Sequence, residues 1–214
     1  MDINATLRLC SAKGAAAVEV IIMRADKLNN AVQFTELIIK SYVKAGNICI
    51  DATAGNGNDT EILANSVGVN GKVFAFDIQK QAIDTTSFRL TAKGLIDRVV
   101  LINDSHENIR SHISDQVDFI IYNLGYLPGG DKELTTSRES TITSLNEALV
   151  LLAPTGLMAI TCFRGHEGAE AEYEAIMHFV SELDQRKYNA FRFEFLNQKN
   201  NPPVVIGVEM RGVA

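Results

Sequence analysis

Apolar residues along the chain gather in short runs, and the stretches between these runs space their apolar residues as amphipathic helices do. The runs are rich in Ile, Val and Phe, which is typical of strands buried in a parallel sheet. The predicted strands cover residues 47–51, 72–77, 99–102, 117–122 and 157–163. The predicted helices cover residues 28–44, 79–93, 135–152 and 169–183, with one more directly after the first strand. This alternation predicts an α/β fold.

Two further strands, residues 188–196 and 204–210, close the pattern. The loop between them, residues 197–203, is short and has no helical pattern. Parallel neighbours need a long crossover connection, so these two strands are expected to pair antiparallel. The expected architecture is a Rossmann-like, seven-stranded and mostly parallel sheet with a C-terminal antiparallel hairpin, as in class I methyltransferases.

A turn that contains two glycines follows the first strand, between Asp51 and Thr60. Gly55 and Gly57 end the strand, and Asn58 or Asp59 is expected to cap the helix that follows. A short polar side chain at such a position satisfies free backbone N–H groups. A strand, a glycine turn and a helix N-terminus form the corner at which doubly wound α/β domains hold a nucleotide.

The charges at this turn distinguish between nucleotide cofactors. A dinucleotide fingerprint needs a third glycine, but Thr60 stands at that position. Asp51 and Asp59 bring two carboxylates to the turn, which favour a cationic ligand over a diphosphate. S-adenosylmethionine carries a sulfonium and an ammonium group and fits this turn, and the alternative is a generic tight turn with solvated acids. The predicted cofactor contacts in the turn are Asp51, Thr53, Ala54, Gly55, Asn56, Gly57, Asp59 and Thr60.

Acidic residues also follow the next two strands. Asp77 ends the second strand, where a carboxylate can accept hydrogen bonds from ribose hydroxyls, and it can also cap the next helix. Asp104 follows the third strand, where it can reach the exocyclic amine of adenine. His106 is interpreted as a helix-start or packing residue rather than a catalyst. The predicted cofactor contacts at these two strand ends are Asp77, Ile78, Gln79, Asp104, Ser105 and His106.

The fourth strand runs into Asn123, Leu124, Gly125 and Tyr126, which are expected to face the cofactor because the first and fourth strands should be neighbours. Methyl transfer to nitrogen needs a neutral amine whose lone pair points at the methyl donor. The side-chain oxygen of Asn123 can accept the N–H bonds of such an amine and orient it. Tyr126 can stack on a base, and Gly125 allows close backbone approach. We count Asn123, Leu124 and Gly125 as cofactor contacts too; the alternative is a loop that merely ends a strand.

Composition narrows the classes of partner. The chain has 214 residues, of which 46% are hydrophobic, and a net charge of −6. The length suits one large domain, and the negative charge argues against a protein that coats nucleic acid non-specifically. A small structured RNA could still meet a local basic patch. Candidate contributors are Lys132, Arg138, Arg164, Arg186 and Lys187, which the sequence alone does not place together.

The three cysteines and the apolar runs indicate the compartment. Cys10, Cys49 and Cys162 lack Cys-x-x-Cys spacing, so we expect small buried residues rather than a disulfide, a metal site or a nucleophile. No apolar run reaches the roughly 18 residues that a membrane helix needs, and no convincing signal peptide is present. We therefore expect no membrane partner and a cytoplasmic location.

Four segments together resemble one bacterial family. They are residues 51–60, 104–107, 123–132 and 165–167. The family is described as "putative rRNA methylases" and includes tRNA 5-aminomethyl-2-thiouridine methyltransferases, which complete 5-methylaminomethyl-2-thiouridine at the wobble position. The resemblance implies a methyltransferase domain at residues 28–214, preceded by an extension of unknown role at residues 1–27. Arg164-Gly165 differs from the Pro-Gly that the resemblance leads us to expect.

The resemblance implies S-adenosylmethionine as methyl donor and a tRNA anticodon arm as partner. The expected reaction is N-methylation of the primary amine of a modified wobble uridine, with no covalent enzyme intermediate. The amine must first lose a proton, and Asp131 and His166 are the candidates for its acceptor or relay. The predicted catalytic residues are therefore Asn123, Tyr126, Asp131 and His166.

Three other functions stay open from the sequence. The same asparagine-containing loop would suit methylation of an exocyclic base amine in rRNA or DNA. An NAD-dependent oxidoreductase is a different class, against which Asp59 and Thr60 speak. A non-catalytic RNA-binding module is the third alternative, which the acidic balance disfavours. The sequence leaves the oligomeric state open, with a homodimer among the partners considered.

Overall fold

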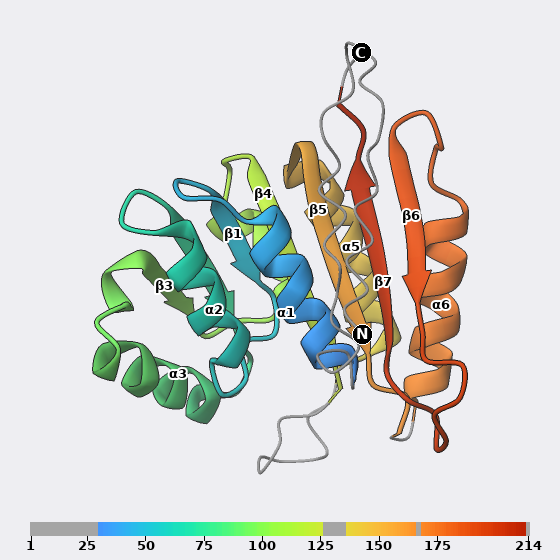
Figure 1. Ribbon diagram of the computed structural model, residues 1–214, viewed down its shortest axis with the longest axis horizontal. Coiled ribbons are helices and arrows are strands. Elements are labelled where there is room, and N and C mark those ends of the chain that lie inside the picture. Colours follow the sequence, from blue (N-terminus) through green and yellow to red (C-terminus); the bar gives the residue numbers. More distant parts are fainter. Residues whose placement is uncertain (1–29, 126–135, 166–167, 213–214) are drawn as a thin grey trace, which may run out of the picture.

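The computed structural model describes residues 30–125, 136–165 and 168–212 (Figure 1). Its strands are β1 (Ile48–Asp51), β2 (Lys72–Phe76), β3 (Val99–Ile102), β4 (Val117–Leu124), β5 (Leu152–Cys162), β6 (Tyr188–Phe193) and β7 (Val204–Met210). They form one seven-stranded sheet in the order β3-β2-β1-β4-β5-β7-β6. The first five strands pair parallel, whereas β7 runs antiparallel to both β5 and β6. The expected sheet and its C-terminal hairpin are confirmed.

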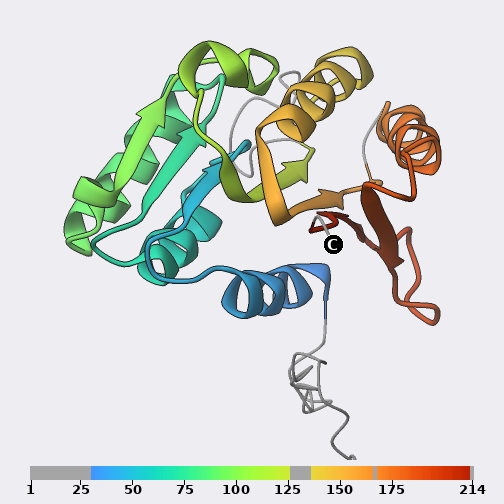
Figure 2. The same cartoon turned by 90° about the horizontal axis from the view of Figure 1, so that it is seen from above.

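Helices cover both faces of this sheet (Figure 2). The helices are α1 (Ala31–Tyr42), α2 (Asn58–Val67), α3 (Lys80–Ala92), α4 (Ile109–His112), α5 (Arg138–Leu151) and α6 (Ala169–Ser181), with short 3-10 turns η2 (Ile96–Arg98) and η3 (His106–Asn108). Residues of α1, α2 and α3 share one buried apolar cluster, and residues of α4, α5 and α6 share another on the opposite face. Each central strand therefore contributes side chains to two cores, which explains the near-continuous apolar runs.

Two strands extend beyond their predicted limits. β4 continues through Leu124, so Asn123 lies within the paired strand, opposite Thr161 of β5. β5 begins at Leu152, directly after α5, whereas the sequence indicated a start at residue 157. The earlier start was not predicted because Pro154 and Gly156, which interrupt the apolar pattern there, are unusual inside strands.

The predicted side-chain cap of α2 is wrong. Gly57, in the left-handed conformation with φ of 77°, is the residue that precedes the helix, and it offers no side chain. Asn58 and Asp59 are the first two residues inside the helix. Elsewhere polar caps are present: Asn30 accepts from the backbone N–H of Gln33 at the start of α1. The proposed extension at residues 1–27 lies outside the described residues.

Candidate active site

A cavity of about 660 Å³ lies beyond the carboxyl ends of the parallel strands. This is the place at which open α/β sheets bind their ligands. Most predicted cofactor contacts line it: Thr53, Ala54, Gly55, Asn56, Asp59, Asp77, Ile78, Gln79, Asp104, Ser105, His106, Asn123 and Gly125. The lining does not include Asp51, Gly57, Thr60 or Leu124. These four residues are buried, and their direct contact with a cofactor stays a prediction.

Asp51 lies beneath the glycine turn and is 0% exposed. Its carboxyl accepts hydrogen bonds from the Thr60 hydroxyl, at 2.6 Å, and from the Thr53 backbone N–H, at 3.2 Å. Burial, followed by the charge of nearby Asp59, raises the pKa of Asp51 to about 7. Asp51 and Thr60 thus connect the end of β1 to the first turn of α2. The sequence motif identified Thr60 only as a replacement for a third glycine and did not indicate this structural role.

Asp77 joins the first two strand ends. Its Oδ2 accepts from the Gly55 N–H at 2.9 Å, and its Oδ1 accepts from the Gln79 N–H at 2.8 Å. Burial raises the pKa of Asp77 above its usual range. Each carboxylate oxygen has a further lone pair, so the side chain can still accept from ribose hydroxyls at the cavity wall. Asp77 does not cap α3, because Gln79 is the residue that precedes the helix and no side chain caps it, whereas the ribose role of Asp77 stays a prediction.

Gly57 is required by packing against α3. A Cβ atom added there would lie 2.8 Å from Thr86 Oγ1 and 2.9 Å from Thr86 Cγ2, and its positive φ already disfavours a side chain. The hydroxyl of Thr86 donates to the Gly55 carbonyl at 3.0 Å. Thr86 of α3 therefore occupies the space beside Gly57, and direct contact of its backbone with the cofactor stays a prediction.

The end of β3 differs in detail from the expectation. The Asp104 carboxylate accepts from His112 Nε2, from Asn108 Nδ2 and from the Ser105 N–H, and these bonds, that of His112 above all, hold its pKa below its usual range. His106 is 7% exposed and packs edge-to-face on Tyr122. Burial lowers the pKa of His106 to about 4, so its imidazole is neutral at pH 7. His106 both begins a 3-10 turn and lines the cavity as an uncharged ring.

Asn123 stands where the first and fourth strands meet. Its backbone N–H donates to the Thr53 hydroxyl at 2.7 Å, and its Nδ2 donates to Asp59 Oδ2 at 2.6 Å. Because the amide nitrogen binds Asp59, the amide oxygen of Asn123 points away from that carboxylate. Burial raises the pKa of Asp59, although its bond with Asn123 acts in the opposite direction. A defined acceptor oxygen in a cavity is the feature that a neutral amine requires.

The cavity is also lined by residues that were not predicted as cofactor contacts or catalytic residues. They are Val32, Ala52, Asn58, Thr136, Ser140, Phe163, Arg164, Gly165, Asn201 and Pro203. Phe163 follows β5, so the rule that selected Asp77 from its strand end could have found it. Asn201 and Pro203 reach the cavity because β7 runs antiparallel, with Val204 paired to Cys162 at the carboxyl end of β5. A loop before an antiparallel strand carries no such signal in the sequence.

Three predicted catalytic residues, Tyr126, Asp131 and His166, lie outside the described residues. Gly125 and Thr136 flank the stretch 126–135, to which Tyr126 and Asp131 belong. The backbone N–H of Thr136 donates to the Gly125 carbonyl at 3.2 Å. Both of these residues line the cavity.

Two of the three cysteines lie in the part of the chain that the structure describes. Cys49 and Cys162 are buried free thiols, and burial raises the pKa of Cys162 to about 12. The prediction of small buried residues is confirmed for these two, whereas Cys10 lies outside the described residues. Within residues 30–125, 136–165 and 168–212, no three His, Cys, Asp or Glu side chains are grouped as metal ligands. In the same ranges, every helix is too short or too polar to cross a membrane.

A sequence model of the family described as "Putative rRNA methylase" matches residues 73–209. The chain belongs to this family. It is 35% identical over 185 residues to the chloroplastic tRNA (mnm(5)s(2)U34)-methyltransferase of Arabidopsis thaliana, a match that covers 82% of this chain and 68% of the relative. A ribosomal RNA small subunit methyltransferase H of Streptococcus mutans is 31% identical over only 87 residues, which are 39% of this chain and 28% of that protein.

Solved structures support the same assignment. A putative rRNA-methylase from Clostridium thermocellum superposes with a TM-score of 0.83 at 42% identity, over 86% of this chain and 98% of that one. A putative methyltransferase from Streptococcus mutans, solved in complex with SAH, gives a TM-score of 0.76 at 33% identity, over 84% of this chain and 97% of that one. The resemblance drawn from the motifs is therefore confirmed at the level of family and fold.

Proposed function

We propose that this chain is an S-adenosylmethionine-dependent N-methyltransferase that acts on the amine of 5-aminomethyl-2-thiouridine at the wobble position of tRNA. The observation that carries the proposal is Asn123, whose amide nitrogen is held by Asp59 in a cavity bounded by the ends of β1, β2 and β3. The similarity to the Arabidopsis thaliana tRNA methyltransferase supplies the substrate class. That relative is longer than the matched region, so its activity enters here as support only.

The cavity fits S-adenosylmethionine in size and chemistry. Its volume lies within the roughly 300–1,000 Å³ that small-molecule sites occupy. Asp77 would hold the ribose, while half-exposed Ile78 and neutral His106 offer apolar and aromatic surface to the adenine. Asp59 brings a carboxylate toward the cationic end. When bound, S-adenosylmethionine supplies a methyl group activated by its sulfonium charge.

Asn123 would serve as the acceptor of the substrate amine. Its oxygen can receive an N–H bond of the amine, which fixes the direction of the nitrogen lone pair. Asp59 and Thr53 determine the orientation of Asn123, through its side chain and its backbone respectively. This arrangement lowers the entropic cost of alignment and needs no enzyme nucleophile, in agreement with the inert buried thiols.

A protonated aminomethyl group must lose its proton before it can attack. The proposed acceptors Asp131 and His166 remain predictions, as does stacking of the base on Tyr126. Homodimer formation and a cytoplasmic location also remain predictions.

Methylation of an exocyclic amine in rRNA is the second candidate. The family description and the match to a ribosomal RNA methyltransferase favour it. The latter match covers a much smaller share of both chains than the match to the tRNA enzyme, so the tRNA substrate is preferred.

The deciding experiment combines purified protein, S-adenosylmethionine and tRNA from a strain that lacks the corresponding gene. Mass spectrometry of the digested tRNA should show 5-aminomethyl-2-thiouridine decreasing while its N-methylated form appears. Parallel reactions with rRNA from the same strain provide the comparison. Methyl incorporation into rRNA alone would transfer the function to the second candidate, and failure to bind S-adenosylmethionine in calorimetry would remove both.

A further inference from the structure

The charges that line the cavity are divided between its two ends. Asp59, Asp77 and Asp104 follow β1, β2 and β3, and each is a carboxylate. Among the described lining residues, Arg164 is the one permanent cation, because the other basic side chain, His106, is neutral at pH 7. Arg164 pairs with Glu170, yet it also lines the cavity of a chain whose net charge is −6.

Arg164 lies well apart from the carboxylates that follow β2 and β3. It comes two residues after β5, which is three strand positions from β2 in the sheet order. Neighbouring strands are spaced by about 4.8 Å, so the two strand ends are separated by roughly 14 Å. The acidic end of the cavity is thus occupied by the proposed cofactor contacts, and the cation belongs to the opposite end.

The guanidinium of Arg164 is held in a fixed orientation. Its Nε and Nη2 donate to the two carboxylate oxygens of Glu170, at 3.0 and 2.8 Å. The same group lies over the ring of Tyr173, 4.5 Å from the ring centroid. The side chain of Arg164 is 22% exposed and that of Glu170 is 52% exposed, so the pair is open to solvent and screened. Glu170 occupies one edge of the fork, which leaves the N–H groups of Nη1 for a ligand.

We propose that Arg164 binds a backbone phosphate of the acceptor nucleotide or of its direct neighbour in RNA. The inference rests on the proposed function, because it assumes that the acceptor belongs to a nucleic acid chain. Planar guanidinium groups that are already oriented suit phosphate oxygens, and an RNA base cannot enter the cavity without bringing its phosphate to the mouth. The carboxylate of the cofactor is the alternative anion that Arg164 could bind. The test below distinguishes this carboxylate from an RNA phosphate.

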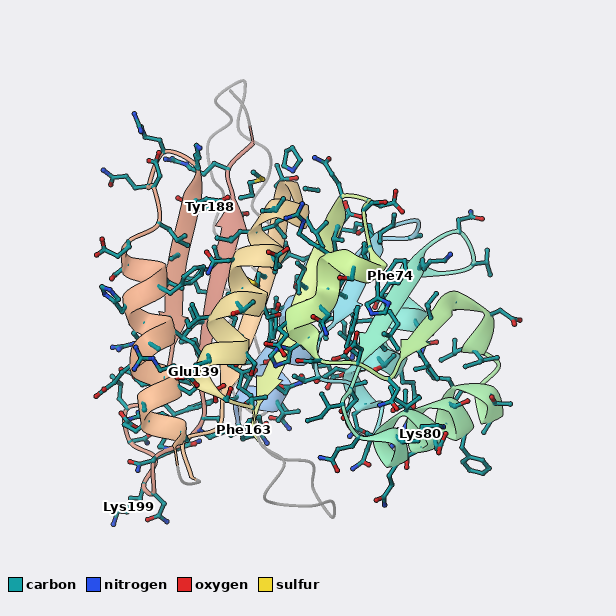
Figure 3. The ribbon with its side chains drawn as sticks, turned by 180° about the vertical axis from the view of Figure 1, so that it is seen from behind. Phe74, Lys80, Glu139, Phe163, Tyr188 and Lys199 are labelled. Carbon is teal, nitrogen blue, oxygen red and sulfur yellow. The ribbon has the colours of Figure 1, made fainter. Side chains whose placement is uncertain are left out.

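Other surface cations fit this role less well. Figure 3 shows Phe163 and Lys199 at one end of the sheet and Tyr188 at the other. Arg186 and Lys187 directly precede Tyr188, so they lie at the end opposite to the cavity. Arg186 and Lys187 therefore do not form a basic patch together with Arg164. Lys199, in contrast, lies at the same end of the sheet as Arg164.

The test measures RNA binding at several salt concentrations, without turnover. The probe is a synthetic anticodon stem-loop that carries 5-aminomethyl-2-thiouridine. Its binding is measured by fluorescence anisotropy in the presence of S-adenosylhomocysteine. Arg164→Gln should weaken binding several-fold and lower the slope of log K against log salt by about 0.7–0.9, the change expected for one lost phosphate contact. Arg164→Lys keeps the charge and should retain most of the slope.

Arg192→Gln is the matched control, since Arg192 also contacts Tyr173 and pairs with Glu194 but does not line the cavity. It should keep the wild-type salt slope. Calorimetry with S-adenosylmethionine should give the same affinity for wild type and Arg164→Gln. An unchanged salt slope in Arg164→Gln, or a loss of cofactor affinity with intact RNA binding, would overturn the inference. Wild-type methylation of tRNA in either case would leave the proposed function standing.

Discussion

The two ends of the cavity differ in how they are built and in the charges that they present. At the end formed by β1, β2 and β3, carboxylates are tied to backbone N–H groups of neighbouring loops, as Asp77 is to Gly55 and Gln79. At the end formed by β5 and β7, Phe163, Arg164 and the loop before β7 form the wall. Under the proposed function, the first end takes the small cationic cofactor and the second takes the phosphate-bearing acceptor.

Under the proposed function, this difference would let one cavity bind two ligands of opposite charge. The strand order separates the ends, so the carboxylates and the guanidinium do not neutralise each other at contact distance. Asn123, at the end of β4, lies between them and is oriented by Asp59 from the acidic side. Substitutions at the acidic end should change cofactor binding, whereas a substitution at the junction should change the rate of transfer.

The largest effect is expected at the junction. Asn123→Ala removes the oriented amide oxygen, so kcat should fall by about 10²-fold or more while the affinity for tRNA changes little. Single-turnover methylation of hypomodified tRNA at saturating concentration measures this. Asn146→Ala, on the exposed face of α5, is the control and should react as wild type. A wild-type rate in Asn123→Ala would leave the amine without its proposed acceptor.

At the acidic end, Asp77→Ala should weaken S-adenosylmethionine binding by about 1.5–3 kcal/mol, the range for hydrogen bonds to a charged group. RNA affinity should stay close to the wild-type value, which is the reverse of the Arg164 expectation. Isothermal calorimetry provides the measurement, and Asp84→Ala, an exposed residue of α3 that pairs with Lys80, provides the control. Equal cofactor affinities for both variants would place the ribose elsewhere.

The frame of the acidic end should be sensitive to its glycine turn. Gly57→Ala combines a left-handed backbone, which costs about 1–2 kcal/mol for a side chain, with contact against Thr86. Gly94 has a similar φ of 66°, but a Cβ atom added there meets nothing within 4 Å. Gly94→Ala should therefore lose only the stability that the left-handed backbone costs. Urea unfolding of both variants measures the difference. If they lose the same free energy of unfolding, the packing of Gly57 on α3 is not limiting.

The last prediction concerns the pH dependence of stability. In the unfolded chain the Asp51 carboxyl has its ordinary pKa near about 4, whereas burial raises the folded value to about 7. Between these values the folded state binds more protons than the unfolded state, so stability falls as pH rises and levels off above pH 7. Asp51→Asn should lack this part of the decline. Thermal unfolding of both proteins should be measured from pH 4 to 8. As the pH rises, the Tm of Asp51→Asn should increase relative to the Tm of the wild type. A difference in Tm that is constant over this range would contradict the assignment.

Local pattern predicted most of the residues that line the acidic end, because its parts are contiguous in sequence. A buried strand followed by an acid, as at β2 and Asp77, is visible in a window of a few residues, and parallel pairing then brings such strand ends together. The same reasoning recovered Asn123 at the end of β4 and the hairpin of β6 and β7. The sequence by itself therefore determined the fold class, the family and one end of the cavity.

Only the tertiary structure decided which groups face the cavity and which lie behind it. Asp51 and Gly57 belong to the glycine turn, yet one is buried under it and the other packs on Thr86. The opposite wall combines residues from α1, the segment directly after β5 and the loop before β7, and the antiparallel direction of β7 brings that loop to the site. Such contacts depend on packing between segments that are distant in the chain, so no local spacing of residues encodes them.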